Sequence, residues 1–127
     1  MKTEIDQSGK IEQTNIDTII ALSNNVKGGV ILNRKVKHQL QDYFRRNKKS
    51  RIFSYIVFSV CIAILLKELK IKQKVIVDLE YLGHNEFIRT HVCLYLKRLG
   101  IKHPTTIFFA SIGKHSPADN LANKIGK

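Results

Sequence analysis

The segment that most constrains the fold runs from Lys74 to Gly83 and reads KVIVDLEYLG. Residues 75 to 77 form a β-branched apolar run, which is typical of a strand buried on both faces of a parallel sheet. Asp78 and Glu80 follow, and two residues apart on a strand they face the same side. Ligands of open α/β sheets bind outside the carboxyl ends of the strands. The segment therefore predicts an α/β fold with an acidic site at one edge of a sheet.

The residues that follow continue the alternation of helix and strand. A helical apolar pattern begins near His84 and ends before Gly100, a residue type that commonly terminates helices. Residues 105 to 110 (TTIFFA) read as a second buried strand, and Ser116-Pro117 has the form of a helix start. A strand, a helix and a second strand in this order form a right-handed crossover unit, so the two strands are expected to be parallel.

The N-terminal part of the chain predicts an antiparallel hairpin. Residues 1 to 15 are polar without periodicity and are expected to form a loose tail, which leaves 16 to 127 as a single domain. Residues 18 to 22 (TIIAL) and 30 to 32 read as two strands, and Gly28-Gly29 reads as the turn between them.

Two helices are expected next. The first is amphipathic and spans residues 36 to 44; the second is an uncharged run of fifteen residues from Ile52 to Leu66. A membrane span needs about 20 apolar residues, so a helix buried in an α/β domain fits this run better, with membrane insertion as the alternative. Cys61 and Cys93 both lie in apolar surroundings, which indicates free thiols in a reducing, cytoplasmic compartment.

The charge of the chain indicates a polyanionic partner. The net charge is +12, and two lysines against four acids give the first 17 residues −2, so the rest carries +14. Such a balance favours nucleic acid, DNA or RNA, over a membrane. The expected phosphate contacts lie beside Tyr43 and Phe44, which are suited to stacking on bases: Arg45, Arg46, Lys48 and Lys49. The alternatives are a solvated helix end and a structural protein with no nucleic-acid role.

From residue 18 to residue 125 the order of elements resembles the ribonuclease H-like fold. That family has an antiparallel strand meander, a buried helix, a strand ending in Asp, a helix, a further strand and a final helix with an acid near its start. Residues 75 to 78 are similar to the Asp-ending strand. Residues 111 to 122 (SIGKHSPADNLA) are similar to the closing motif, in which a His-bearing loop precedes an Asp and a Leu-Ala pair. The resemblance implies a mixed sheet with helices on both faces.

The resemblance also implies roles for individual residues. Asp78 and Asp119 would be metal ligands for Mg²⁺ or Mn²⁺, and His115 would transfer a proton or assist product release. Glu80 is the neighbouring acid that can complete the set, since carboxylate oxygens suit these hard cations. Lys114, in a Gly-Lys loop before a helix, adds an anion-binding position. Small archaeal proteins of no known activity share a similar acid-Tyr-x-Gly and Gly-Lys-x-Ser-Pro-Ala pattern.

Two acids of the family pattern are missing from the expected positions. The acid of the first strand should fall near Ser23, and the acid of the buried helix near Phe53 or Ser54. Two-metal phosphoryl chemistry needs several carboxylates to hold both ions. The sequence therefore favours a nucleic-acid-binding protein on a degenerate ribonuclease H-like scaffold, with a metal-dependent nuclease as the alternative.

Overall fold

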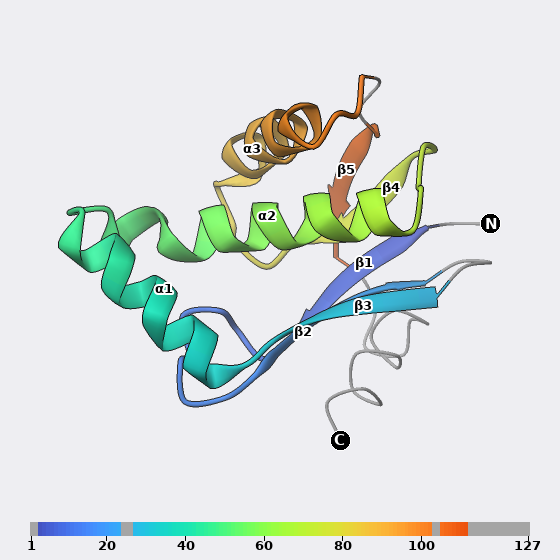
Figure 1. The fold of residues 1–127 in the computed structure, drawn as a ribbon. Helices are drawn as coiled ribbons and strands as arrows, with labels where there is room; N and C mark the ends of the chain where they lie inside the picture. Colours follow the sequence, from blue (N-terminus) through green and yellow to red (C-terminus); the bar gives the residue numbers. More distant parts are fainter. Residues whose placement is uncertain (1–2, 24–26, 103–104, 112–127) are drawn as a thin grey trace.

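The computed structural model describes residues 3–23, 27–102 and 105–111, and it forms a mixed five-stranded sheet with helices (Figure 1). The strand order is β3-β2-β1-β4-β5. β1 pairs antiparallel with β2, and β2 pairs antiparallel with β3, whereas β4 runs parallel to β1 and to β5. The α/β class is thereby confirmed. The strands are β1 (Glu4–Ser8), β2 (Thr18–Ser23), β3 (Lys27–Leu32), β4 (Val75–Asp78) and β5 (Ile107–Ala110).

The expected loose tail at residues 1 to 15 is wrong, because it contains the central strand of the sheet. β1 lies between β2 and β4, and Ile5 is fully buried. Only one of its five residues is apolar, so neither hydrophobicity nor alternation marks it as a strand. β1 is stabilised by backbone hydrogen bonds to β2 on one side and β4 on the other. These long-range pairings leave no pattern in the sequence of β1 itself.

The predicted hairpin is confirmed as β2 and β3, but the predicted Gly28-Gly29 turn is wrong. Both glycines lie within β3 and pair with Leu22 and Ala21 of β2. A Cβ atom on Gly28 would lie 3.0 Å from the side chain of Leu69, just after helix α2. The glycine there permits close packing of the strand against that segment, rather than a reversal of the chain.

Three α-helices accompany the sheet in the described residues. They are α1 (Arg34–Arg46), α2 (Phe53–Glu68) and α3 (Asn85–Arg98), with a short 3₁₀ turn, η1 (Ser50–Ile52), before α2. Asn33 caps α1 by accepting a hydrogen bond from the Val36 amide at 2.9 Å. The parallel pairing of β4 with β5 around α3 confirms the predicted crossover unit. The predicted final helix lies outside the described residues, so helices on both faces remain a prediction.

The core lies between the sheet and helices α2 and α3, which lie on the same side of it (Figure 1). Ile5, Leu22 and Val77 from three adjacent strands point into this core and are fully buried. β4 alternates between buried and half-buried residues, so it is less enclosed than its apolar run predicts. By length and composition Ser50–Glu68 is apolar enough to cross a membrane; half of its most apolar window is buried within the protein. The core helix of a globular protein has the same composition.

Candidate metal centre

Three carboxylates meet where the middle of β1 lies beside the carboxyl end of β4. Asp6, Asp78 and Glu80 each offer an oxygen atom, and these atoms all lie within 4.8 Å of one another. Asp6 is buried, whereas Asp78 and Glu80 are half-buried. Carboxylate oxygens at this spacing are a suitable ligand set for a hard divalent cation such as Mg²⁺ or Mn²⁺.

The parallel register of β1 and β4 explains this convergence. Glu4 pairs with Ile76 and Ile5 with Val77, so the next position places Asp6 beside Asp78. Both aspartates therefore lie on the sheet face opposite the fully buried Ile5 and Val77. Glu80 lies just beyond the end of β4, where its amide donates to the Asp78 carbonyl oxygen at 2.9 Å. That tight turn brings the third carboxylate back to the other two.

The close approach of like charges changes the acidity of Glu80. Burial raises the pKa of the Glu80 carboxyl to about 7, and a hydrogen bond and the negative charge from Asp78 add to that rise. The hydrogen bonds between the Glu80 carboxylate and the side chains of Asp6 and Gln7 lower this pKa. Glu80 is therefore poised to lose a proton near neutral pH, and a cation among the three carboxylates would favour that loss.

A polar chain supports the cluster from the side of the core. Gln7 follows Asp6, and its amide donates to Asp6 Oδ1 at 2.8 Å. Gln7 Nε2 donates to the hydroxyl oxygen of Tyr81 at 3.2 Å, and the Tyr81 hydroxyl donates to Glu12 Oε1 at 3.2 Å. Gln7 Oε1 is buried and accepts no hydrogen bond from any described residue. A buried amide oxygen in that position is suited to a ligand or to the water shell of an ion.

The sequence-predicted site residues divide into three groups. Asp78 and Glu80 are brought together as predicted, while Asp119, His115 and Lys114 lie outside the described residues. The expectation that the first strand of the sheet ends near Ser23 is wrong, because that strand is β1, which carries Glu4 and Asp6. The phosphate-contact candidates are exposed around the end of α1: Arg45, Arg46, Lys48 and Lys49.

Asp6 is the site residue that the sequence reasoning missed. The available signal was the family expectation itself, since an acid was sought on the first strand and only the strand was misplaced. Lys37 is a second correction, because it belongs to the basic stretch yet is fully buried. Its ammonium donates to three backbone carbonyls of the β1–β2 connection, those of Lys10, Gln13 and Ile16, at 3.1, 2.8 and 2.6 Å.

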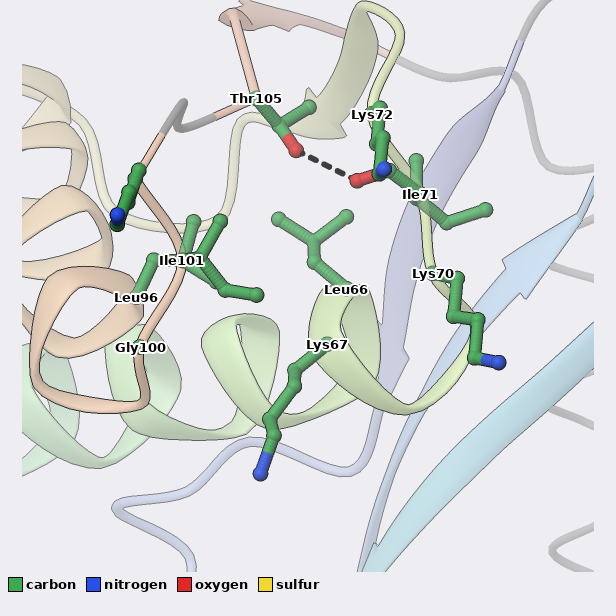
Figure 2. Close-up of a pocket in the computed structure, with 10 residues that line it drawn as sticks. Leu66, Lys67, Lys70, Ile71, Lys72, Leu96, Gly100, Ile101 and Thr105 are labelled. Carbon is green, nitrogen blue, oxygen red and sulfur yellow. Dashed lines mark hydrogen bonds between the residues drawn. The ribbon is translucent and has the colours of Figure 1, made fainter.

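A hollow of about 670 Å³ lies at the opposite edge of the sheet, before β4 and β5 begin (Figure 2). Its floor is aliphatic, and Figure 2 shows Leu66 and Ile101 pointing into it. The Thr105 hydroxyl closes one side by donating to the Ile71 carbonyl oxygen at 2.9 Å. Lys67 and Lys70 line the rim, but their ammonium groups extend away from the centre. Lys72 and Lys102 also line the hollow, and among the described residues no aromatic or acidic one does.

Comparison with protein-family models, with curated proteins and with solved structures finds no match for this chain. The function is therefore argued from the acid cluster, the charge distribution and the sheet topology.

Proposed function

We propose that this protein is a divalent-metal-dependent nuclease that hydrolyses phosphodiester bonds on a ribonuclease H-like scaffold. The observation that carries the proposal is the convergence of Asp6 of β1 with Asp78 and Glu80 at the carboxyl end of β4, the adjacent parallel strand. The order of elements supports the scaffold: an antiparallel meander, a buried helix, a strand ending in Asp, a further helix and a parallel strand. This order is the one that the resemblance in the sequence implies.

In this proposal each carboxylate has a defined task. Asp6 and Asp78 are fixed by strand pairing and hold the ion, and Glu80 completes the set from the turn after β4. A Mg²⁺ or Mn²⁺ ion held by these carboxylates would stabilise charge on the phosphoryl group and lower the pKa of a water molecule. Because the pKa of Glu80 is about 7, binding of the ion near neutrality would release the Glu80 proton. In hydrolysis the attacking water would lose a proton to solvent and bond to phosphorus, while the bond to the leaving oxygen breaks and that oxygen takes up a proton from solvent.

The positive charge at the end of α1 supports nucleic acid as the class of substrate. The basic residues at the end of α1 are exposed and supply phosphate contacts. Contacts to about five phosphates of a duplex give a log–log salt slope of roughly −4. Substituting Arg45, Arg46, Lys48 and Lys49 together by Gln is expected to flatten that slope, as measured by fluorescence anisotropy of a labelled oligonucleotide. An affinity that stays the same from low to high salt would rule out a nucleic-acid footprint on this surface.

Cleavage assays test the catalytic part. Labelled single-stranded RNA, single-stranded DNA and duplexes are incubated with the protein in Mg²⁺, in Mn²⁺ or in EDTA. We expect cleavage only with a divalent ion, and a loss of at least about 100-fold for Asp78→Asn. Glu68→Gln, at the far end of α2, is the matched control and should keep wild-type activity. Equal cleavage by Asp78→Asn would place the activity at another site or in a contaminant.

A second candidate function is nucleic-acid binding without cleavage, and one observation favours it. The single acid of α2 is Glu68, its last residue, so the helix offers no carboxylate where the resemblance expects one. Three carboxylates suit one cation better than the two ions of two-metal hydrolysis. Salt-dependent binding together with intact nucleic acid in both Mg²⁺ and Mn²⁺ would favour this binding module over the nuclease.

A further inference from the structure

A second hollow, of about 340 Å³, lies where α1 and α2 meet, and it brings together residues far apart in the sequence. We call it the corner hollow; its walls include Tyr43, Phe44, Lys49, Ile56, Tyr95 and Arg98. The last two residues come from α3, whereas the others come from the end of α1, the connection after it and the start of α2. Figure 1 shows this corner at the N-terminal end of α2.

The rings of the corner hollow are held in place by other rings. Phe53 is buried and contacts Phe44 edge to face at 5.5 Å between centroids. Phe44 in turn contacts Tyr43 edge to face at 5.9 Å. Tyr43 is 59% exposed, an unusual degree for an aromatic side chain supported by a core residue. The Tyr43 ring is therefore both positioned and accessible.

The opposite wall combines an aromatic ring with a cation. The Arg98 guanidinium lies over the Tyr95 ring, 5.7 Å from its centroid. Lys49 adds a second cation to the lining. A largely polar hollow that contains two tyrosine rings and two cations matches the chemistry of a base and its phosphate. Its volume falls within the usual range of small-ligand sites, about 300–1,000 Å³.

A row of rings extends from the corner hollow along α3 to the residues beside the acid cluster. The Tyr95 and His91 ring centroids lie 6.1 Å apart, and His91 stacks on Phe87 with centroids 4.1 Å apart. Tyr55 follows, with its centroid 6.0 Å from that of Phe87 and 5.4 Å from that of Tyr81. The first four rings of the row are half-buried, whereas Tyr81 is buried and belongs to the hydrogen-bonded chain beside Asp6.

We propose that the corner hollow binds one nucleotide of a single-stranded nucleic acid, with its base on Tyr43 and Tyr95 and its phosphate on Lys49 and Arg98. This inference rests on the proposed function, and it specifies that the substrate is single-stranded rather than duplex nucleic acid. The larger lysine-rimmed hollow is the weaker candidate, because it has no aromatic ring in its lining and its lysines Lys67 and Lys70 point away.

Binding is tested in EDTA, so that cleavage plays no part. The probes are a labelled 12-nucleotide single strand of deoxythymidylate, an abasic strand of the same length and a 12-base-pair duplex, each measured by fluorescence anisotropy. We expect the wild type to bind the thymidylate strand about tenfold more tightly than the abasic strand. Tyr43→Leu and Tyr95→Leu should remove most of that preference. Phe108→Leu is the matched control. Phe108 is another exposed ring, at 48%, but it lies on β5, outside the corner hollow.

The cations are tested separately from the rings. Lys49→Gln and Arg98→Gln should each reduce the single-strand salt slope by about 0.7, and they should leave the base preference in place. Lys48→Gln, outside the hollow, should lower the slope without altering that preference. Circular dichroism and urea unfolding of each variant establish that it is folded; Tyr43→Leu is the decisive one, because its side chain is largely exposed.

Three outcomes would overturn the proposal. They are an equal affinity of the wild type for thymidylate and abasic strands, an unchanged base preference in folded Tyr43→Leu, and competition by poly-glutamate as effective as that by the thymidylate strand. Any of these can occur while divalent-dependent cleavage of a duplex persists, in which case the proposed nuclease function stands and the corner hollow is not its substrate site.

Discussion

Within the described residues, charged groups are enclosed at Lys37 and at the acid cluster, and their surroundings differ. The Lys37 ammonium donates to three carbonyl oxygens, which attach the β1–β2 connection to α1. Glu80 lies beside two further carboxylates, Asp6 and Asp78, that carry the same charge. Burying a charge is costly unless hydrogen bonds or an opposite charge compensate it. Carbonyl oxygens surround the cation at the first site, whereas the second keeps like charges together despite the hydrogen bond that Asp6 accepts from the Gln7 amide.

This difference separates a structural site from a functional one. Burial lowers the pKa of Lys37 below its usual value, and the charges of Asp17 and Glu12 act in the opposite direction. The three hydrogen bonds from its ammonium make Lys37 a clasp between α1 and the β1–β2 connection. At the acid cluster both burial and a like charge raise the pKa of Glu80. Proteins keep such destabilising arrangements mainly where a ligand relieves them. The comparison therefore predicts that changes at Lys37 alter stability, whereas changes at the acid cluster alter cation binding.

The largest effect is expected at the clasp. Lys37→Met retains much of the side-chain volume but removes all three hydrogen bonds from the ammonium to the β1–β2 connection. We expect a loss of about 3 kcal/mol in the free energy of unfolding, measured by urea denaturation. Lys35→Met, exposed on the same helix, should change it by less than about 0.5 kcal/mol. A loss below about 1 kcal/mol for Lys37→Met would show that the clasp is not structural.

The next effect concerns proton competition at the acid cluster. Because the pKa of Glu80 is raised to about 7, protons should compete with the cation below neutrality. The apparent affinity for Mn²⁺ should fall up to about tenfold for each pH unit between 7 and 5. Titration calorimetry at several pH values measures this. In Glu80→Gln the dependence should be weaker, and a slope equal to that of the wild type would assign the proton to another group.

In the absence of a cation, ionisation of the Glu80 carboxyl should make the free energy of unfolding depend on pH. The folded-state pKa of Glu80, about 7, exceeds its ordinary value of 4.5, so the folded protein binds the proton more tightly. Stability should therefore be greatest below about pH 4.5, decline as the pH rises to 7 and then level off with respect to this group. Glu80→Gln should remove that decline and be more stable than the wild type by about 1 kcal/mol at pH 8 in EDTA. No difference between the two in urea midpoint at pH 8 would contradict this account.

The smallest effect is expected at Glu12, the last residue in the hydrogen-bonded series Gln7–Tyr81–Glu12 beside the acid cluster. Glu12→Gln keeps an oxygen that accepts from Tyr81, so the free energy of unfolding should fall by about 0.5 kcal/mol or less. Cation affinity should be unchanged, because Glu12 contacts the cluster only through Tyr81 and Gln7. Parallel urea and calorimetric measurements separate the two readouts. A change in affinity without a change in stability would make Glu12 part of the site.

Much of the fold was predictable because its signals are local. β4, β5, α1 and α3 carry the apolar spacing that strands and helices require, and their boundaries were found to within a few residues. Cys61 was correctly placed in the core, where burial raises the pKa of its thiol to about 12. β1 was missed because a short central strand can be polar when its neighbours supply the ladder hydrogen bonds.

The site was half predicted for the same reason. Asp78 and Glu80 follow a recognisable strand, so their location at a sheet edge could be derived. Asp6 could not be placed beside them, because its position depends on the parallel register between strands some seventy residues apart. Lys37 shows the converse, since a lysine in a basic helical stretch gives no sign that its side chain is buried.

Titration of the metal-free protein with Mn²⁺ at pH 7.5 tests the central claim most directly. The protein should bind one ion per chain, and Asp6→Asn should weaken binding at least about tenfold while remaining folded by circular dichroism. Glu4→Gln, two residues earlier on the same strand and outside the acid cluster, should bind like the wild type. A wild type that binds no ion at millimolar Mn²⁺, or a folded Asp6→Asn protein with wild-type affinity, would contradict a metal centre formed by Asp6, Asp78 and Glu80.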